Sequence, residues 1–296
     1  MTIRRRCYMC EAEGSTSEHV PPRALFPQAK DAAGQDHRAD LITVPSCELH
    51  NMGKSRDDEF LMVSLAGIIG NNSIGYRHKF TKVNRAIRRT SYKLLMGAFA
   101  SKPKLHVVDL GNNRFIDVLW GTPDQARLAF CFERIVRGLH YHHFGIPYAG
   151  QVKVLIGYLS YETGSTRNLQ RFMLDKAEME LECRPKFGRN QDVFYYQVTD
   201  PDEFGLSLFR LCFYGGVNVY VSLIPDSAEA PKHLGFELMK RGIKTMFTLG
   251  DRTYEADFGR EDSRTPSAAA DAGKTMQPDQ YRDWPSHVST PHHLAI

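Results

Sequence analysis

Two closely spaced pairs of metal-ligand residues lie near the start of the chain. Cys7 and Cys10 are separated by two residues, and so are Cys47 and His50. Spacing of this kind places two ligands on each side of one tetrahedral ion and is typical of structural zinc sites. The alternative is three free thiols and an unrelated histidine. Because two such pairs arise by chance far less often than one, we expect a closed Zn²⁺ site that holds a short β-ribbon to a helix.

The cysteine context favours metal over disulfides. The chain has 296 residues and six cysteines, and its charged N-terminus has no apolar stretch behind it. This is not the pattern of a secretory signal, so we expect a cytoplasmic protein in a reducing compartment. No run approaches the roughly 20 apolar residues of a membrane helix, so no membrane partner is expected. The other three cysteines, expected to be buried thiols in apolar runs, are Cys131, Cys183 and Cys212.

Four polar residues accompany the paired ligands. Glu18 and His19 stand between the two pairs, ahead of two prolines, and Asn51 and Lys54 follow the second pair. In this order the residues resemble the zinc-stabilised branch of the HNH endonucleases, over roughly residues 4–66. In that family two strands and a helix, the ββα-metal or His-Me finger, grip one divalent cation. The resemblance therefore implies an N-terminal nuclease domain.

The resemblance also implies a role for each residue. His19 matches the general base, Glu18 the acidic metal ligand, and Asn51 the last residue of the HNH signature. A neutral imidazole is suited to deprotonating a water near neutral pH. A hard cation, Mg²⁺ or Mn²⁺, held by Glu18 and the Asn51 amide oxygen would place positive charge on the scissile phosphate. We expect one helix from Cys47 to about residue 67, with Lys54 about one turn after Asn51 and able to stabilise a phosphate oxygen.

Two positions depart from the family pattern. His50 stands where this branch usually has cysteine, a substitution that zinc accepts. The middle asparagine of the signature is missing: its register falls near Ile42, and Asp40 is a candidate substitute. In the family that asparagine orders the loop around the general base. Its absence supports an alternative function, a non-catalytic zinc-stabilised nucleic-acid-binding or adaptor module; a nuclease directed at RNA is a third.

A basic segment follows the motif. Between Glu59 and Asp109 there are nine cations and no acidic residue, so with a net charge of +4 the rest of the chain carries −5. Apolar residues from Val83 to Leu95 recur at near-helical spacing, which indicates an amphipathic helix with a basic face. Beside a nuclease motif we expect phosphate contacts, to DNA first and RNA as the alternative. The cations expected to make them are Arg77, Lys79, Lys82, Arg85, Arg88, Arg89 and Lys93.

The remainder of the chain has an α+β pattern. Strand-like runs at 105–110 and 115–120 predict a hairpin, and Thr122 is the expected N-cap of a helix that ends near His143. We expect His140, His142 and His143 to pack rather than bind a second metal, and Asp57, Asp58 and Glu59 to form a solvated helix face. Four further strands are predicted at 152–159, 193–198, 206–213 and 217–223.

The expected fold class is α+β, with a zinc-bound ββα-metal (HNH) domain followed by a larger mixed α+β domain. The leading hypothesis is a metal-dependent endonuclease that cleaves phosphodiester bonds in DNA, in a defence or mobile-element setting. The larger domain is expected to bind a protein partner, a regulatory ligand, the nucleic acid or a second copy of the chain. The predicted divisions are 1–72 for the nuclease domain, 73–104 for a basic linker or nucleic-acid-contacting segment, 105–258 for the α+β domain, and 259–296 for a flexible tail.

Overall fold

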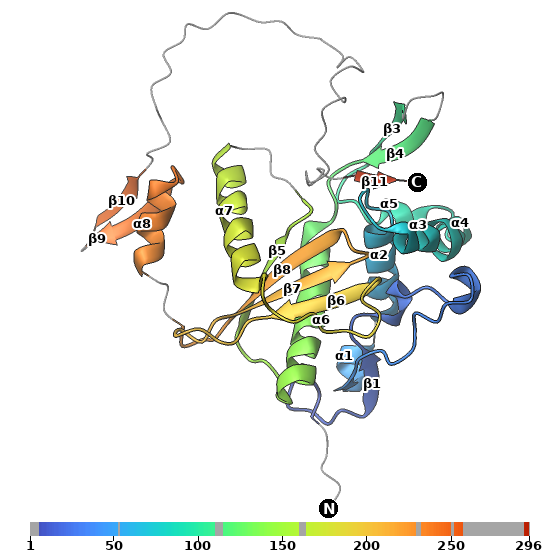
Figure 1. Ribbon diagram of the computed structural model, residues 1–296, viewed down its shortest axis with the longest axis horizontal. Helices are drawn as coiled ribbons and strands as arrows, with labels where there is room; N and C mark the ends of the chain where they lie inside the picture. Colours follow the sequence, from blue (N-terminus) through green and yellow to red (C-terminus); the bar gives the residue numbers. More distant parts are fainter. Residues whose placement is uncertain are drawn as a thin grey trace, which may run out of the picture.

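A mixed α+β arrangement surrounds a four-stranded antiparallel sheet, with the N-terminal segment at one side of it (Figure 1). The computed structural model describes residues 6–52, 54–109, 115–159, 164–228, 232–249, 252–256 and 293–295. The predicted tail lies outside these residues except for a short strand, β11 (His293–Ala295). Among the residues described, no helix has the length and apolar character needed to cross a membrane.

A two-stranded ribbon carries the predicted motif. β1 (Thr16–His19) pairs antiparallel with β2 (Thr43–Ser46), which places His19 opposite Thr43. The strand-like run at residues 41–44 predicts a strand that ends at Pro45, but this proline lies inside β2. Each strand of a two-stranded ribbon has a free edge, so the missing N–H of proline costs no ladder hydrogen bond.

The short run at residues 7–9 is strand-like in sequence, but the chain before the ribbon forms a turn there. The backbone N–H of Cys7 donates to the carbonyl of Ala12 (2.8 Å), and that of Tyr8 donates to the carbonyl of Pro45 (2.9 Å). The turn is therefore attached to β2. Between the strands lie two 3-10 turns, η1 (Arg23–Leu25) and η2 (Ala29–Asp31).

Two helices replace the single helix predicted after Cys47. α1 (Glu48–Asn51) ends at Met52, which has an extended conformation (φ −68°, ψ 140°), and α2 (Lys54–Ala66) follows. An extended residue breaks the i to i−4 hydrogen-bond ladder, so Asn51 and Lys54 belong to different helices and the predicted one-turn relation is wrong. Most of α2 from Phe60 onward is buried.

The basic segment is helical, as predicted, but in several pieces. Asn72 caps the first piece by accepting hydrogen bonds from the backbone N–H groups of Ile74 and Gly75 (3.1 and 3.0 Å). Val83, Ile87 and Leu95 are buried, which confirms the amphipathic pattern. The pieces are α3 (Ser73–His78), the π-helical turn η3 (Lys79–Val83), α4 (Asn84–Arg89) and α5 (Lys93–Met96).

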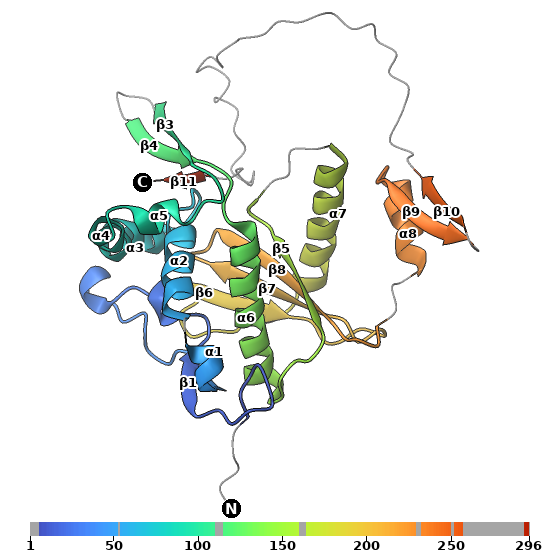
Figure 2. The same cartoon turned by 180° about the vertical axis from the view of Figure 1, so that it is seen from behind.

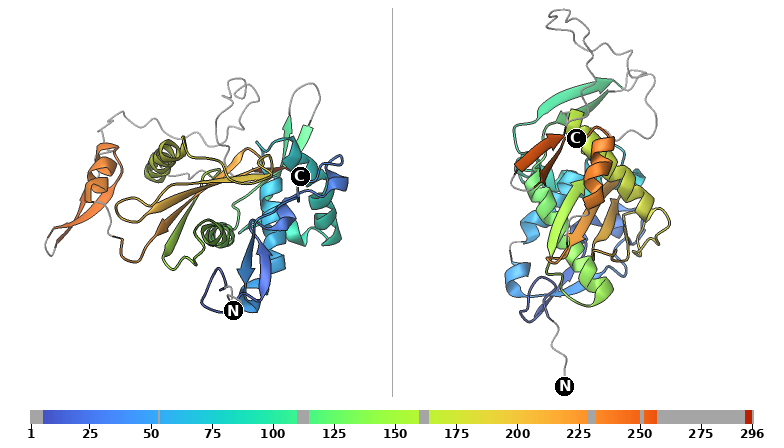
Figure 3. Two further views of the ribbon diagram at one scale, coloured as in Figure 1. Left: turned by 60° about the horizontal axis from the view of Figure 1, so that its bottom comes forward. Right: turned by 90° about the vertical axis from the view of Figure 1, so that its left-hand side faces the viewer.

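Two long helices cover opposite faces of the central sheet (Figure 3). Alternate residues of the strands face α6 and α7: Phe209 packs into the core shared with α6, whereas Leu208 packs with α7. The predicted strands are confirmed, in the order β5-β8-β7-β6. The elements are α6 (Gln125–Phe144), β5 (Gln151–Ile156), α7 (Gly164–Leu181), β6 (Phe194–Val198), β7 (Ser207–Phe213) and β8 (Val217–Ile224).

The start of α6 differs from the prediction. Asp124, not Thr122, is the N-cap, and its carboxylate accepts a hydrogen bond from the backbone N–H of Arg127 (3.0 Å). Thr122 instead uses its carbonyl to accept from the N–H of Ala100 (2.9 Å). A carboxylate at the N-cap also interacts favourably with the helix dipole.

Smaller elements lie at the periphery. The predicted hairpin is confirmed as β3 (Lys104–Asp109) paired with β4 (Phe115–Trp120), and β11 adds to β4. A separate group at the other side of the molecule comprises α8 (Lys232–Lys240), β9 (Thr245–Leu249) and β10 (Arg252–Ala256) (Figure 1).

One buried apolar cluster joins the N-terminal segment to the central sheet. It runs from Cys7 to Leu223 and includes residues of α2, α6 and β6–β8. α6 lies between α2 and the sheet (Figure 2). The hydroxyl of Tyr214, at the end of β7, donates to the carbonyl of Leu25 in η1 (2.6 Å). The N-terminal segment and the sheet therefore share a core, and the predicted domain boundaries stay a prediction.

Candidate functional site

The four predicted zinc ligands form a compact cluster. Their ligand atoms all lie within 4.8 Å of one another. His50 Nδ1 is 3.5 Å from the sulfurs of Cys7 and Cys10 and 3.2 Å from that of Cys47, and the Cys10 and Cys47 sulfurs are 3.9 Å apart. A tetrahedral Zn²⁺ separates a nitrogen and a sulfur ligand by about 3.5 Å, and two sulfur ligands by about 3.8 Å. The cluster can therefore hold a metal such as zinc.

Backbone groups around the cluster favour the metal-binding form of Cys47, whereas burial raises the pKa of Cys10. The N–H of Met9 donates to the sulfur of Cys7 (3.5 Å). The pKa of Cys47 is lowered, chiefly by a hydrogen bond from the backbone of His50. Thiolate is the ligand form of cysteine, so this arrangement suits a metal centre. From α6, Arg134 donates through Nη2 to the carbonyl of His50, which ties the cluster to the central helix.

Glu18 is a buried carboxylate beside the metal cluster. Its Oε1 accepts hydrogen bonds from the hydroxyl of Tyr8 (2.7 Å) and from Lys54 Nζ. Its Oε2 is buried and has no hydrogen-bond partner among the described residues. Buried charged oxygens are normally paired, so an unpartnered one marks a position suited to a cation or a water. Burial also raises the pKa of Tyr8.

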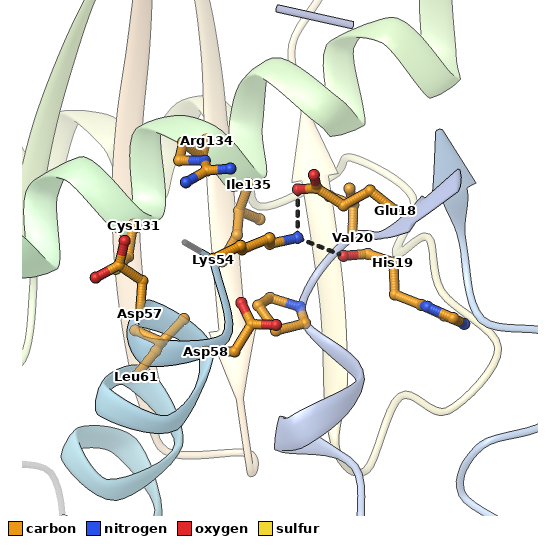
Figure 4. Close-up of a pocket in the computed structure, with 11 residues that line it drawn as sticks. Glu18, His19, Val20, Lys54, Asp57, Asp58, Leu61, Cys131, Arg134 and Ile135 are labelled. Atoms are coloured by element: carbon orange, nitrogen blue, oxygen red, sulfur yellow. Dashed lines mark hydrogen bonds and ion pairs between the residues drawn. The ribbon is translucent and has the colours of Figure 1, made fainter. Parts of the chain in front are cut away.

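Glu18 lines a small cavity between β1, α2 and α6 (Figure 4). The pKa of Asp58, on the α2 side, is raised to about 6 because burial disfavours its charged form. Asp57 pairs with Arg127 Nε of α6 (3.0 Å). The expectation of a solvated face is therefore wrong for Asp57 and Asp58. The lining residues are Glu18, His19, Val20, Pro22, Lys54, Asp57, Asp58, Leu61, Cys131, Arg134 and Ile135.

His19 ends β1 and is half-buried. Its carbonyl accepts a hydrogen bond from Lys54 Nζ (3.3 Å), whereas its imidazole points away from the cavity (Figure 4). Burial lowers the pKa of His19, and the charges of Arg23, Lys54 and Arg38 lower it further. A lowered pKa keeps the imidazole neutral near pH 7, in the form that accepts a proton.

Two other predicted positions lie apart from the cavity. Asn51 is the last residue of α1, and its side chain is exposed and does not line the cavity. Asp40, the candidate substitute for the missing asparagine, has a left-handed backbone (φ 50°) and is paired with Arg189 Nε (3.6 Å) at the surface. The structure thus joins Glu18, His19 and Lys54 at one place and leaves Asn51 and Asp40 outside it.

The predicted basic residues have different environments. Lys79 is buried, which lowers its pKa to about 8. Arg85 donates to both oxygens of Asp31 (2.8 and 2.9 Å), and Arg89 pairs with Glu59 (3.4 Å). Lys82 is half-buried. The remaining residues, which are exposed, are Arg77, Arg88 and Lys93.

A groove beside α2 collects cations from three helical segments. It is lined by Arg56 of α2, by Arg89 and Lys93 of the basic segment, and by Arg127 of α6. Glu59 is the acidic residue among its lining. The net positive charge of this groove suits a polyanion.

Several site residues carried no signal in the sequence. Arg134 and Cys131 come from α6, about 80 residues after the second ligand pair, and no motif marks them. Burial raises the pKa of Cys131 to about 12, which makes it an inert thiol rather than a nucleophile. Cys131 and Cys212 are buried as predicted, but Cys183 is exposed.

Two of the three histidines of α6, His140 and His143, pack against aromatic rings, as predicted. The ring centroid of His140 is 5.1 Å from that of Tyr148, and His143 lies 5.1 Å from Phe187. Among the described residues, the Cys7–His50 cluster is the one group of three or more potential ligands arranged for a metal.

Comparison of the chain with protein-family models, with curated proteins and with solved structures finds no match. Functional assignment therefore depends on the cluster and the cavity themselves.

Proposed function

We propose that this protein is a metal-dependent endonuclease of the HNH type that hydrolyses phosphodiester bonds in DNA. The observation that carries the proposal is the adjacency of two groups in β1: a half-buried imidazole with a lowered pKa at His19, and a buried carboxylate with an unpartnered oxygen at Glu18. General-base hydrolysis of a phosphodiester needs both a proton acceptor and a cation site.

The structural metal in this proposal is Zn²⁺ bound by Cys7, Cys10, Cys47 and His50. Four protein ligands leave no open coordination position, so such a site has a structural role rather than a catalytic one. It attaches the turn before β1 to the start of α1, and thereby fixes the strand that carries Glu18 and His19.

In the proposed mechanism His19 accepts a proton from the attacking water through its neutral imidazole. Glu18, through Oε2, is the residue that would hold Mg²⁺ or Mn²⁺, which when bound would supply positive charge to the scissile phosphate and the leaving oxygen. Lys54 bonds both to Glu18 and to the carbonyl of His19, so it orients the two residues relative to each other. Its ammonium group also adds positive charge beside the reacting phosphate.

A second candidate function has its own supporting observation. Lys54 already neutralises Glu18 as an ion pair, and Asn51 lies outside the cavity. A site neutralised in this way suits a non-catalytic module that binds nucleic acid through the groove at Arg56, Arg89 and Lys93. The two functions differ in one respect: a binding module shifts the mobility of DNA and never cuts it.

The decisive experiment compares wild type with His19→Ala on supercoiled plasmid, linear duplex, single-stranded DNA and RNA, with Mg²⁺ or Mn²⁺ supplied. Loss of a general base is expected to lower the cleavage rate about 10²- to 10⁴-fold. His142→Ala is the matched control, because His142 is an exposed histidine of α6 that does not line the cavity.

Zinc content and thermal stability should be the same in wild type and both variants. Full activity of His19→Ala would exclude the proposed role of His19. DNA binding by the wild type without cleavage under any metal would favour the binding module. Cleavage confined to RNA would replace DNA as the substrate.

A further inference from the structure

The 3-10 turn η1, four residues after His19, holds a lysine and a histidine from the basic segment. The carbonyl of Ala24 accepts a hydrogen bond from Lys82 Nζ (3.2 Å) and another from His78 Nε2 (3.1 Å). His78 is fully buried, and burial lowers its pKa to about 4, so it is a neutral donor. Lys82 therefore places a positive charge at the turn. His78 donates a second hydrogen bond to the same carbonyl.

An arginine from another segment binds the same turn. Arg38 donates through Nε to the carbonyl of Phe26 (2.9 Å), the residue that ends η1. The carbonyl between these two, that of Leu25, accepts from the buried hydroxyl of Tyr214 (2.6 Å). The turn is thus held by three segments far apart in sequence, and two of them contribute cations to it.

Arg23 adds a third cation at the start of the turn. Its side chain is exposed and forms no hydrogen bond or ion pair with any residue that the structure describes. The charges of Arg23 and Arg38 both act on the imidazole of His19, which points away from the cavity (Figure 4). Arg23 and Arg38 therefore lie close enough to His19 to lower its pKa, and Lys82 lies close enough to both of them for their charges to lower its own pKa.

The two carboxylates nearest Arg38 each have another hydrogen-bond partner. Asp31 is engaged by Arg85, which donates to both of its oxygens (2.8 and 2.9 Å). Asp36 accepts a hydrogen bond from the backbone N–H of Arg38 (2.8 Å) at the surface. Mutual repulsion adds to burial in lowering the pKa of Lys82, to about 8, and that of Arg38. Asp31 acts on both Arg38 and Lys82 and offsets the repulsion only in part, because both pKa values are still lowered. A fixed group of like charges with incomplete counter-charge is the electrostatic pattern of an anion site.

We propose that Arg23, Arg38 and Lys82 form a phosphate clamp that binds a backbone phosphate of DNA beside His19. The phosphate clamp rests on the proposed function. Its residues lie outside those that carry the HNH resemblance. Of the predicted basic residues, the clamp includes Lys82. Lys79 is buried, and Arg85 forms an ion pair with Asp31. Backbone contacts of this kind position the duplex without reading its sequence.

The test is the binding of a fluorescent 25-base-pair duplex by His19→Ala protein, without added Mg²⁺ or Mn²⁺, over a range of salt concentrations. In that background Arg23→Ala and Lys82→Ala should each weaken binding about 3- to 10-fold and reduce the slope of log affinity against log salt by about 0.9, the value for one phosphate contact. Arg23→Ala removes no side-chain hydrogen bond to any residue that the structure describes. In Lys82→Ala the Ala24 carbonyl keeps its bond from His78.

Arg171→Ala is the matched control, since Arg171 is an exposed arginine of α7, on the far face of the sheet (Figure 3). Affinities and salt slopes of Arg23→Ala and Lys82→Ala equal to those of Arg171→Ala would overturn the clamp. The two proposals fail separately, because this assay measures binding and the plasmid assay measures cleavage. If His19→Ala cleaves DNA at the wild-type rate and Arg23→Ala binds DNA more weakly, the catalytic role of His19 is excluded and the phosphate clamp is supported.

Discussion

The metal cluster and the Glu18 cavity share the same β-ribbon but are assembled differently. The cluster draws its four ligands from two short turns, and the distances between their ligand atoms match one tetrahedral ion. The cavity is built from β1, α2 and α6, and its charged groups satisfy one another incompletely. A closed set of ligands supplies stability, whereas an incompletely satisfied polar site supplies a place for chemistry.

The two sites also differ in whether their residues are held by contacts close in sequence or by contacts with distant segments. Each pair of ligands is fixed by hydrogen bonds within a few residues, such as that from Met9 to Cys7. Glu18 depends instead on Lys54, and the strand that carries it packs on α6, where Gly138 leaves room for Val20. Perturbing the cluster should therefore affect both sites. Perturbing α6 at Gly138 should affect the cavity more than the cluster, which α6 contacts elsewhere, through Arg134 and the carbonyl of His50.

The largest expected effect follows loss of the metal. Cys47→Ser should abolish the expected one equivalent of bound zinc and lower stability by about 4 kcal/mol or more, or about 10 °C in Tm, because folding of such sites is coupled to metal binding. Metal analysis and thermal unfolding measure both. Since the cluster and the sheet share a core, the cavity should lose its structure as well.

Cys183→Ser is the control for this variant, because Cys183 is exposed and is not part of the cluster. Its Tm should stay within about 1–2 °C of wild type, as for other surface substitutions. Unchanged zinc content and Tm in Cys47→Ser would show that the cluster binds no structural metal.

A smaller effect is expected from acid, through His78 behind the turn η1. Its pKa is lowered to about 4 in the folded protein by burial and then by the charge of Lys82. The unfolded chain takes up a proton below about pH 6.5, so stability falls as the pH is lowered from 6.5 to 4, by roughly 3 kcal/mol in total. Above pH 6.5 this residue should contribute no pH dependence.

Urea unfolding of wild type and His78→Gln at pH 7 and pH 4.5 measures this contribution. Glutamine retains an N–H donor for the carbonyl of Ala24 but does not titrate. The stability lost on acidification should be smaller in His78→Gln, and any loss of metal at low pH cancels in the comparison. Equal losses in the two proteins would contradict the assignment of the effect to His78.

The smallest effect is expected where α6 meets β1. A Cβ atom added at Gly138 would lie 2.7 Å from Cγ2 of Val20, the residue after His19. Gly138→Ala should therefore cost about 1–3 kcal/mol and shift the strand end, which lowers cleavage while zinc content stays normal. Chemical unfolding, the plasmid assay and metal analysis measure the three quantities.

The matched control is Gly235→Ala in α8, where an added Cβ meets nothing within 4 Å. That change should leave activity intact and raise stability by a few tenths of a kcal/mol to about 1 kcal/mol. Loss of zinc from Gly138→Ala would contradict the expectation that a change at this position of α6 leaves the cluster intact.

Much of the fold was accessible to prediction wherever the signal was periodic. The predictions of an amphipathic segment with Val83 and Ile87 buried, and of the four strands of the central sheet, were correct. The errors lie where one residue's conformation decides the outcome: Met52 is extended and divides the predicted helix, and Pro45 lies inside β2. Neither conformation is visible in the periodicity of the sequence, because each depends on the contacts that the neighbouring segment makes in the folded protein.

The sequence by itself indicated the ligand cluster, because two intervening residues bring both members of each pair within reach of one ion. Only the tertiary structure decided the environment of Glu18 and His19. Burial of Glu18 beside α6 leaves one oxygen unpartnered, and the cations that act on His19 come from η1, from α2 and from the loop before β2. Burial and electrostatic interaction depend on residues that are close in space, and spacing along the chain does not record them.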